Sequence, residues 1–143
     1  MSHTASTGLR WHRIVLLCAC IHSGVWGAFI IGLPEKSARI YGFAQTPHDL
    51  HLWRGTGLFI VLLAVGYALA ANNVQQHWGS VLIGLLAKVL GSIGMCSAAL
   101  QGQVSTRVLW LLPVNDVIWW LPFLFIVRYG IQQSRRLKTK SVE

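Results

Sequence analysis

The two residues whose types and spacing could do chemistry are a lysine and an aspartate, each inside a long apolar segment. Lys88 is the only charged residue between positions 79 and 100, and Asp116 follows Asn115 within the apolar segment 108–127. An unpaired charge at the centre of a bilayer costs at least ~2.5–3.5 kcal/mol on insertion scales, so each charge needs a partner inside the fold. A lysine and a carboxylate buried together form either a structural ion pair or a site that binds or relays a proton.

The depths of the two side chains predict that they meet. The segments are consecutive and should form antiparallel helices, with Lys88 roughly 13 Å below the start of its helix at ~1.5 Å per residue. Asp116 lies roughly 12 Å below the start of the next helix, measured from the opposite face of the membrane. In a hydrocarbon core ~30 Å thick, both side chains reach nearly the same level. We therefore predict an interior pair of Lys88 and Asp116.

An alternative places Asp116 near the surface. Asn115 could be the N-cap of a helix, with residues 108–112 lying at the membrane interface, and Lys88 would then lack its partner. The apolar sequence continues without interruption on both sides of Asn115 and Asp116, which favours the deep position.

Further polar and aromatic residues extend this interior site. His22 should lie about 12 Å from the cytoplasmic end of the first helix, level with the pair, as an interhelical hydrogen-bond partner or as a ligand or proton relay. Tyr67 adds a phenol in the inner half of the second helix. Trp119 and Trp120 are interpreted either as packing and lipid-facing aromatics or as the wall of a flat ligand.

Two features near the start of the second helix have competing interpretations. Arg54 can extend its head to the lipid headgroups, or it can point inward and hold an anionic group near the outer face. His48 and His51 would share a helical face, but Asp49 points elsewhere and no further ligand is close in sequence. We predict a solvated loop here and no metal site.

The composition is typical of an integral membrane protein. Hydrophobic residues make up 54% and charged residues 11%, which excludes a disordered chain and a secreted soluble domain. The formal charge of +8 is spread over the ends of the apolar segments and a basic tail, so nucleic-acid binding is not expected. Three cysteines without a C-x-x-C motif argue against a disulfide framework.

The predicted fold is all-α: an integral membrane four-helix bundle that forms a single domain over residues 1–143. The apolar segments that define the spans are 14–33, 55–71, 79–100 and 108–127. Residues 35–43 are expected to form a short interfacial segment between the first two helices, and residues 72–78 a short loop. A stripe of Gly24, Ala28 and Gly32 is expected to let another helix approach the first one closely.

Charge predicts the orientation of the bundle. About 7 positive residues lie on the side of the two chain ends, in the N-terminal segment 1–13, at Arg128 and in the basic tail 132–143, against about 4 on the other side. We therefore expect both termini in the cytoplasm of a multi-pass protein of the inner (cytoplasmic) membrane.

Short motifs resemble a known family. A Gly-rich first helix ending in Leu33-Pro34-Glu35, the sequence Tyr41-Gly42-Phe43, and Arg54-Gly55-Thr56-Gly57-Leu58-Phe59 at the second helix are similar to the DoxX-like group of small bacterial four-helix membrane proteins. The resemblance implies the four-span layout. The group is functionally mixed and is similar to membrane subunits of quinone-linked sulfur oxidation.

Three classes of function fit these features. The first is a membrane module or subunit that binds a lipophilic or quinone-like molecule, or a lipid, at an apolar pocket with few polar groups. The second is a structural partner subunit in which the ion pair fixes helix packing. The third is a proton-coupled transporter or membrane enzyme acting as an oligomer, because four spans are few for a monomeric transporter. The expected partners are the lipid bilayer, a second copy of the chain or another membrane subunit.

Overall fold

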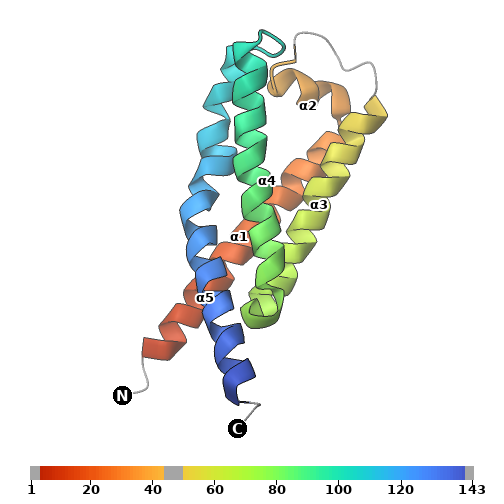
Figure 1. The fold of residues 1–143 in the computed structure, drawn as a ribbon. Coiled ribbons are helices and arrows are strands. Elements are labelled where there is room, and N and C mark those ends of the chain that lie inside the picture. Colours follow the sequence, from red (N-terminus) through yellow and green to blue (C-terminus); the bar gives the residue numbers. More distant parts are fainter. Residues whose placement is uncertain (1–3, 44–49, 141–143) are drawn as a thin grey trace.

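The computed structural model describes residues 4–43 and 50–140, with side chains for 11–43 and 50–136. The chain is all-α, as predicted, and most of it lies in four long helices (Figure 1). These helices are α1 (Thr4–Gly32), α3 (Leu50–Asn72), α4 (Val74–Leu100) and α5 (Ile118–Lys140), and the short α2 (Pro34–Ile40) follows α1. Before α5, the chain forms a 3₁₀-helix, η1 (Thr106–Trp110), and a π-helical turn, η2 (Pro113–Val117).

Four helical segments are long and apolar enough to cross a membrane. They are Trp11–Gly32, Leu50–Asn72, Val74–Leu100 and Thr106–Arg136. Large apolar side chains also remain exposed along the outside of each of them, including Ile21, Leu62, Leu90 and Leu124. Lipid tails rather than water suit such a surface, so the chain is a multi-pass membrane protein.

The two ends of the chain lie at the same end of the bundle, with α2 and the α4–η1 connection at the other (Figure 1). The helix α1 crosses the bundle obliquely. Near the termini it contacts α5, where the rings of His12 and Tyr129 are 4.5 Å apart, and towards α2 it packs on α3. An even number of spans accounts for the shared location of the termini.

Two glycines make the crossing of α1 and α3 possible. A Cβ on Gly27 would lie 2.7 Å from the carbonyl oxygen of Gly57, and a Cβ on Gly57 would lie 2.9 Å from the carbonyl oxygen of Gly27. The predicted stripe was therefore partly wrong: Gly24 faces α3, but Ala28 is exposed and Gly32 has open space around it. The close approach of α1 to α3 is instead at Gly27, three residues after Gly24.

The core near the terminal end is built around one tyrosine. Tyr67 is fully buried, its ring lies 5.0 Å from that of Phe123, and Leu16 and Val81 belong to the same cluster. A Cβ on Gly84 would overlap the Tyr67 phenol, so this glycine makes the space that the ring occupies. The contact between Tyr67 and Gly84 therefore packs α3 directly against α4 at this level.

At the opposite end, α2 is tied both to α3 and to the α4–η1 connection. The indole Nε1 of Trp53 donates to Ser37 Oγ at 2.9 Å, and the Ser105 amide donates to the Gly42 carbonyl at 2.6 Å. Gly42 has φ +82°, a conformation that a side chain disfavours, and a Cβ there would meet Ser105. The predicted interfacial segment is thus a short helix held across the end of the bundle.

Several helix bounds differ from those predicted. The first helix begins at Thr4, within the polar N-terminal segment, and α5 continues to Lys140, within the basic tail. The loop predicted over residues 72–78 is reduced to Asn73, whose side-chain oxygen accepts a bond from the Gln76 amide at 3.2 Å. An N-cap asparagine satisfies a first-turn donor, so a new helix can begin directly after the previous one.

Candidate functional site: an interior cavity at a lysine–aspartate pair

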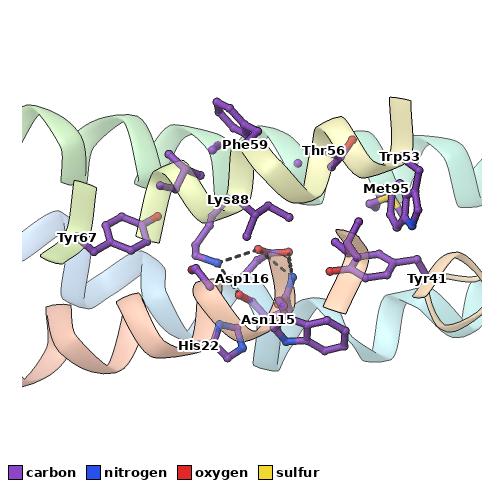
Figure 2. A pocket seen from close by; sticks show the side chains of 17 residues that line it. His22, Tyr41, Trp53, Thr56, Phe59, Tyr67, Lys88, Met95, Asn115 and Asp116 are labelled. Atoms are coloured by element: carbon purple, nitrogen blue, oxygen red, sulfur yellow. Dashed lines mark hydrogen bonds and ion pairs between the residues drawn. The ribbon is translucent and has the colours of Figure 1, made fainter. Parts of the chain in front are cut away.

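The predicted contact between Lys88 and Asp116 is confirmed. Lys88 Nζ lies 3.3 Å from Asp116 Oδ1, and the two side chains are only 10% and 14% exposed. The ammonium group makes a shorter bond to the backbone, donating to the Asn115 carbonyl oxygen at 2.7 Å (Figure 2). Lys88 therefore has two oxygen partners on the segment that precedes α5.

The π-helical turn presents both of these partners. Pro113 begins the turn and has no amide hydrogen to donate. In a π-helical turn the backbone hydrogen bonds join residues five positions apart, one more than in an α-helix. The alternative in which Asn115 caps a helix is wrong, because its amide donates to the Leu111 carbonyl at 2.8 Å within a continuing helical segment. The Asn115 side-chain amide lies 3.5 Å from both Asp116 carboxylate oxygens, a distance at which a hydrogen bond is weak.

A cavity of about 310 Å³ surrounds the pair. Most of its wall is apolar or aromatic, and it is formed by α1, α3, α4, the end of α2 and the π-helical turn (Figure 2). The residues that line it are His22, Ser23, Trp26, Ile30, Tyr41, Trp53, Thr56, Phe59, Ile60, Leu63, Tyr67, Ala87, Lys88, Gly91, Met95, Asn115 and Asp116. An apolar enclosure with a few converging polar groups is the usual form of a small-molecule site.

Tyr67 contributes a hydroxyl with no partner. The residue is 0% exposed, its phenol points towards Lys88 and Asp116 (Figure 2), and its oxygen has no hydrogen-bond partner among the described residues. His22 Nδ1 is also buried without a partner in the part of the chain that the structure describes. Buried polar groups are nearly always hydrogen-bonded, so these two atoms are available to form hydrogen bonds with a molecule bound in the cavity.

Aromatic rings close the end of the cavity near α2. The ring of Tyr41 lies 5.7 Å from that of Trp26 and 5.3 Å from that of Trp53, both edge to face. The Tyr41 hydroxyl points towards the polar pair from the side opposite Tyr67 (Figure 2). Burial, reinforced by the charge of Asp116, raises the pKa of Tyr41 to about 12, although a hydrogen bond with the Asn115 side chain acts in the other direction. Tyr41 therefore stays a neutral phenol at physiological pH.

The cavity reaches the outer surface between α3 and α4. Thr56 and Phe59 of α3 and Gly91 of α4 are all exposed and all line it, and Phe59 is 50% exposed. Tyr67 and Gly84 close the same two helices towards the terminal end. Because this surface belongs to the apolar spans, the opening faces the lipid tails.

Five of the predicted site residues come together here: Lys88, Asp116, Asn115, His22 and Tyr67. Three lie outside the cavity. Arg54 is exposed, and Trp119 and Trp120 are half-buried and do not line it. The Trp119 ring packs against those of His22 and Phe123, at 5.6 and 5.8 Å, so it supports the wall from behind.

The residues that close the cavity near α2 were not predicted from the sequence. Tyr41 and Trp53 are separated by a stretch whose path cannot be read from periodicity, so their contact was not foreseen. The signal available was the aromatic sequence Tyr41-Gly42-Phe43 directly before the second long helix.

Metal binding has no support from the described histidines. No group of three or more His, Cys, Asp or Glu side chains is close enough to hold a metal within residues 11–43 and 50–136. Of the sequence considered earlier for a metal, His48 and Asp49 lie outside the described residues, and His51 is exposed.

Comparisons with protein-family models, with curated proteins and with solved structures find no match to this chain. The resemblance to DoxX-like proteins therefore stays a prediction.

Proposed function

We propose that the protein is a membrane-embedded binding module for a lipophilic molecule with a polar, hydrogen-bond-accepting head, such as a quinone. The head would occupy the cavity beside Lys88, and an apolar tail would leave between α3 and α4 into the lipid. The observation that carries this proposal is the unpartnered Tyr67 hydroxyl, fully buried and directed at the ion pair.

The arrangement of donors suits a head with acceptors on two sides. Tyr67 and Tyr41 approach the pair from opposite ends of the cavity, and Lys88 lies between them (Figure 2). A buried hydroxyl without a partner costs about 1–3 kcal/mol, and a ligand carbonyl would remove that cost. The volume of about 310 Å³ is at the lower end of ligand pockets, which suits a single-ring head with its tail outside.

A structural subunit is the second candidate. Lys88 already has a carboxylate and a carbonyl as partners, so the pair is complete without a ligand and holds α4 against the π-helical turn. Such a pair can specify one packing of helices. The structural role leaves the Tyr67 hydroxyl and His22 Nδ1 unexplained, and for that reason we prefer the binding role.

We propose the cytoplasmic membrane as the location, with both termini in the cytoplasm. The support is the bias of positive residues towards the terminal end: Arg10, Arg13, Arg128, Arg135, Arg136, Lys138 and Lys140 against Lys36, Arg39, Arg54 and Arg107. A second copy or another membrane subunit would meet the apolar outer faces of the spans.

Titration of the purified protein with a decyl-tailed benzoquinone tests the binding role. Tyr67→Phe removes one hydroxyl that has no partner among the described residues, so it should weaken binding about three- to tenfold without lowering the thermal stability of the unliganded protein. Tyr129→Phe is the matched control, because Tyr129 lies outside the cavity. This variant should bind the quinone as tightly as the wild type does.

Equal quinone affinities of Tyr67→Phe, Tyr129→Phe and wild type would show that the Tyr67 hydroxyl does not contact the ligand, and would refute the observation on which the proposal rests. Failure of the wild type to bind the quinone, with Tyr67→Phe at least as stable as wild type, would favour the structural subunit.

A further inference from the structure

A second hollow lies at the terminal end of the bundle, where α1, the α3–α4 junction and α5 meet. Its volume is about 290 Å³. Unlike the interior cavity, it is lined largely by polar and basic residues: His12, Arg13, Ala71, Asn72, Asn73, Val74, Gln75 and Tyr129. None of the lining residues is acidic.

His12 is the buried polar group of this hollow. It is 9% exposed, its ring lies 4.5 Å from that of Tyr129 and 5.1 Å from that of Trp11, and its Nδ1 has no partner among the residues with described side chains. These ring contacts fix the imidazole and leave its Nδ1 available to a group bound in the hollow.

The other side of the hollow is the beginning of α4. Val74 and Gln75 occupy the first two helical positions after the N-cap Asn73, where amide groups have no acceptor within the helix. The Asn73 side chain serves the amide of Gln76, further into the first turn. The first-turn amides of α4 favour an anion, whereas the last carbonyls of α3, which ends at Asn72 beside the same hollow, oppose one, so the full charge of Arg13 decides the sign.

Charge and position together indicate the anion. Arg13 is exposed and lines the hollow, and it adds a full positive charge beside His12. His12 and Arg13 directly precede the apolar run that begins at Ile14, and Trp11 beside them is 44% exposed, so the hollow lies at the level of the lipid headgroups. The anionic groups at that level are phosphate esters.

We propose that this hollow binds the phosphate group of an anionic membrane lipid, with Arg13, His12 and the first turn of α4 as its donors. The site is separate from the interior cavity, and it does not depend on the function proposed for that cavity. A free phosphate offers the same chemistry, so the test distinguishes the two sources.

The test is native mass spectrometry of the full chain released from nanodiscs that contain equal amounts of phosphatidylglycerol and phosphatidylcholine. The wild type should retain phosphatidylglycerol selectively. Arg13→Gln and His12→Phe should each reduce the retained amount about tenfold, as expected for the loss of a charge-assisted or buried hydrogen bond. Arg136→Gln, which removes one exposed positive charge from a residue that does not line the hollow, should change it by less than about twofold.

His12→Phe keeps a ring between Trp11 and Tyr129, and melting in pure phosphatidylcholine checks that the variant is folded. If Arg136→Gln loses as much lipid as Arg13→Gln, the selectivity comes from general surface charge and the site is refuted. If neither lipid is preferred and inorganic phosphate protects Arg13 from chemical modification, the site takes a soluble anion and the lipid assignment is overturned.

Discussion

Replacing either member of the Lys88–Asp116 pair should destabilise the bundle, and replacing both should restore much of the stability. Lys88→Met and Asp116→Leu remove the charges and keep apolar side chains of similar bulk. In each single variant the surviving charge is left in an interior position, since the wild-type side chains are only 10% and 14% exposed. Breaking a buried pair in this way costs about 3–5 kcal/mol.

The contact distance sets the scale of the coupling. At 3.3 Å and an effective dielectric constant of about 20, the attraction is 332/(20 × 3.3), or about 5 kcal/mol, before desolvation is subtracted. The net coupling between close residues is smaller, and we expect about 1–3 kcal/mol. Lys88→Met should be the costlier single change, because among the described residues it leaves Asp116 with the weak 3.5 Å contacts to the Asn115 amide alone. In Asp116→Leu, Lys88 keeps its 2.7 Å bond to the Asn115 carbonyl.

The assay is reversible denaturant unfolding of all four proteins in one detergent, followed by tryptophan fluorescence. The coupling energy is taken from the complete double-mutant cycle, because each single variant also loses interactions that do not involve the other member of the pair. Harmless single changes that add without coupling would refute the reasoning, as would an Asp116→Leu variant that is less stable than Lys88→Met.

Three further predictions follow from other parts of the fold. Gly27→Ala should destabilise the protein by about 1–3 kcal/mol through overlap at the α1–α3 crossing, and Gly32→Ala, with open space around it, should not; thermal melting that ranks them equally would contradict the crossing. Burial of the neutral Tyr41 phenol should contribute its full stability below about pH 10, the ordinary tyrosine pKa, and this contribution should be lost as the pH rises through about 12. Tyr41→Phe should flatten that part of a curve of unfolding free energy against pH, and an unchanged curve would argue against the burial. Reporter fusions after Lys138 and within residues 47–51 should report opposite sides of the membrane, and signals from one side would exclude the four-span topology.

The four spans and the ion pair were predictable because each depends on a strong local signal. A run of about 20 apolar residues must cross the bilayer as a helix, since its backbone has no other way to pair its polar groups. A charge inside such a run must find a partner at its own depth, and depth follows from counting residues along a helix. The same count correctly brought Asn115 and His22 to the level of the pair.

The details of helix packing were not predictable in the same way. Gly24, Gly27 and Gly32 all lie on α1, and only the tilt of α1 across the bundle decides that Gly27 meets Gly57. Tilt depends on contacts with every neighbouring helix, and sequence spacing contains no record of it. For the same reason, the sequence did not show that Trp119 lies behind the cavity wall, although Asn115 and Asp116 on the preceding turn line the cavity.

The end of the cavity near α2 depends on contacts between distant residues. Trp53 reaches Ser37 across 16 positions, and Gly42 bonds to Ser105 across 63 (105 − 42). Neither contact has a periodic signature. The π-helical turn has no such signature either, because Pro113 indicates a lost hydrogen bond without indicating which wider turn replaces it.

The most direct test of the binding role is to fill the cavity opening and measure the bound molecule. Gly91 lies three residues after Lys88 and four before Met95, on the same face of α4, and has no neighbouring atom within 4 Å of an added Cβ. Gly94 is equally open but does not line the cavity. After loading with the decyl-tailed benzoquinone, solvent extraction and mass spectrometry should find the quinone on wild type and Gly94→Leu and little on Gly91→Leu, with all three folded. Equal amounts on Gly91→Leu and Gly94→Leu, or none on wild type, would contradict the proposal.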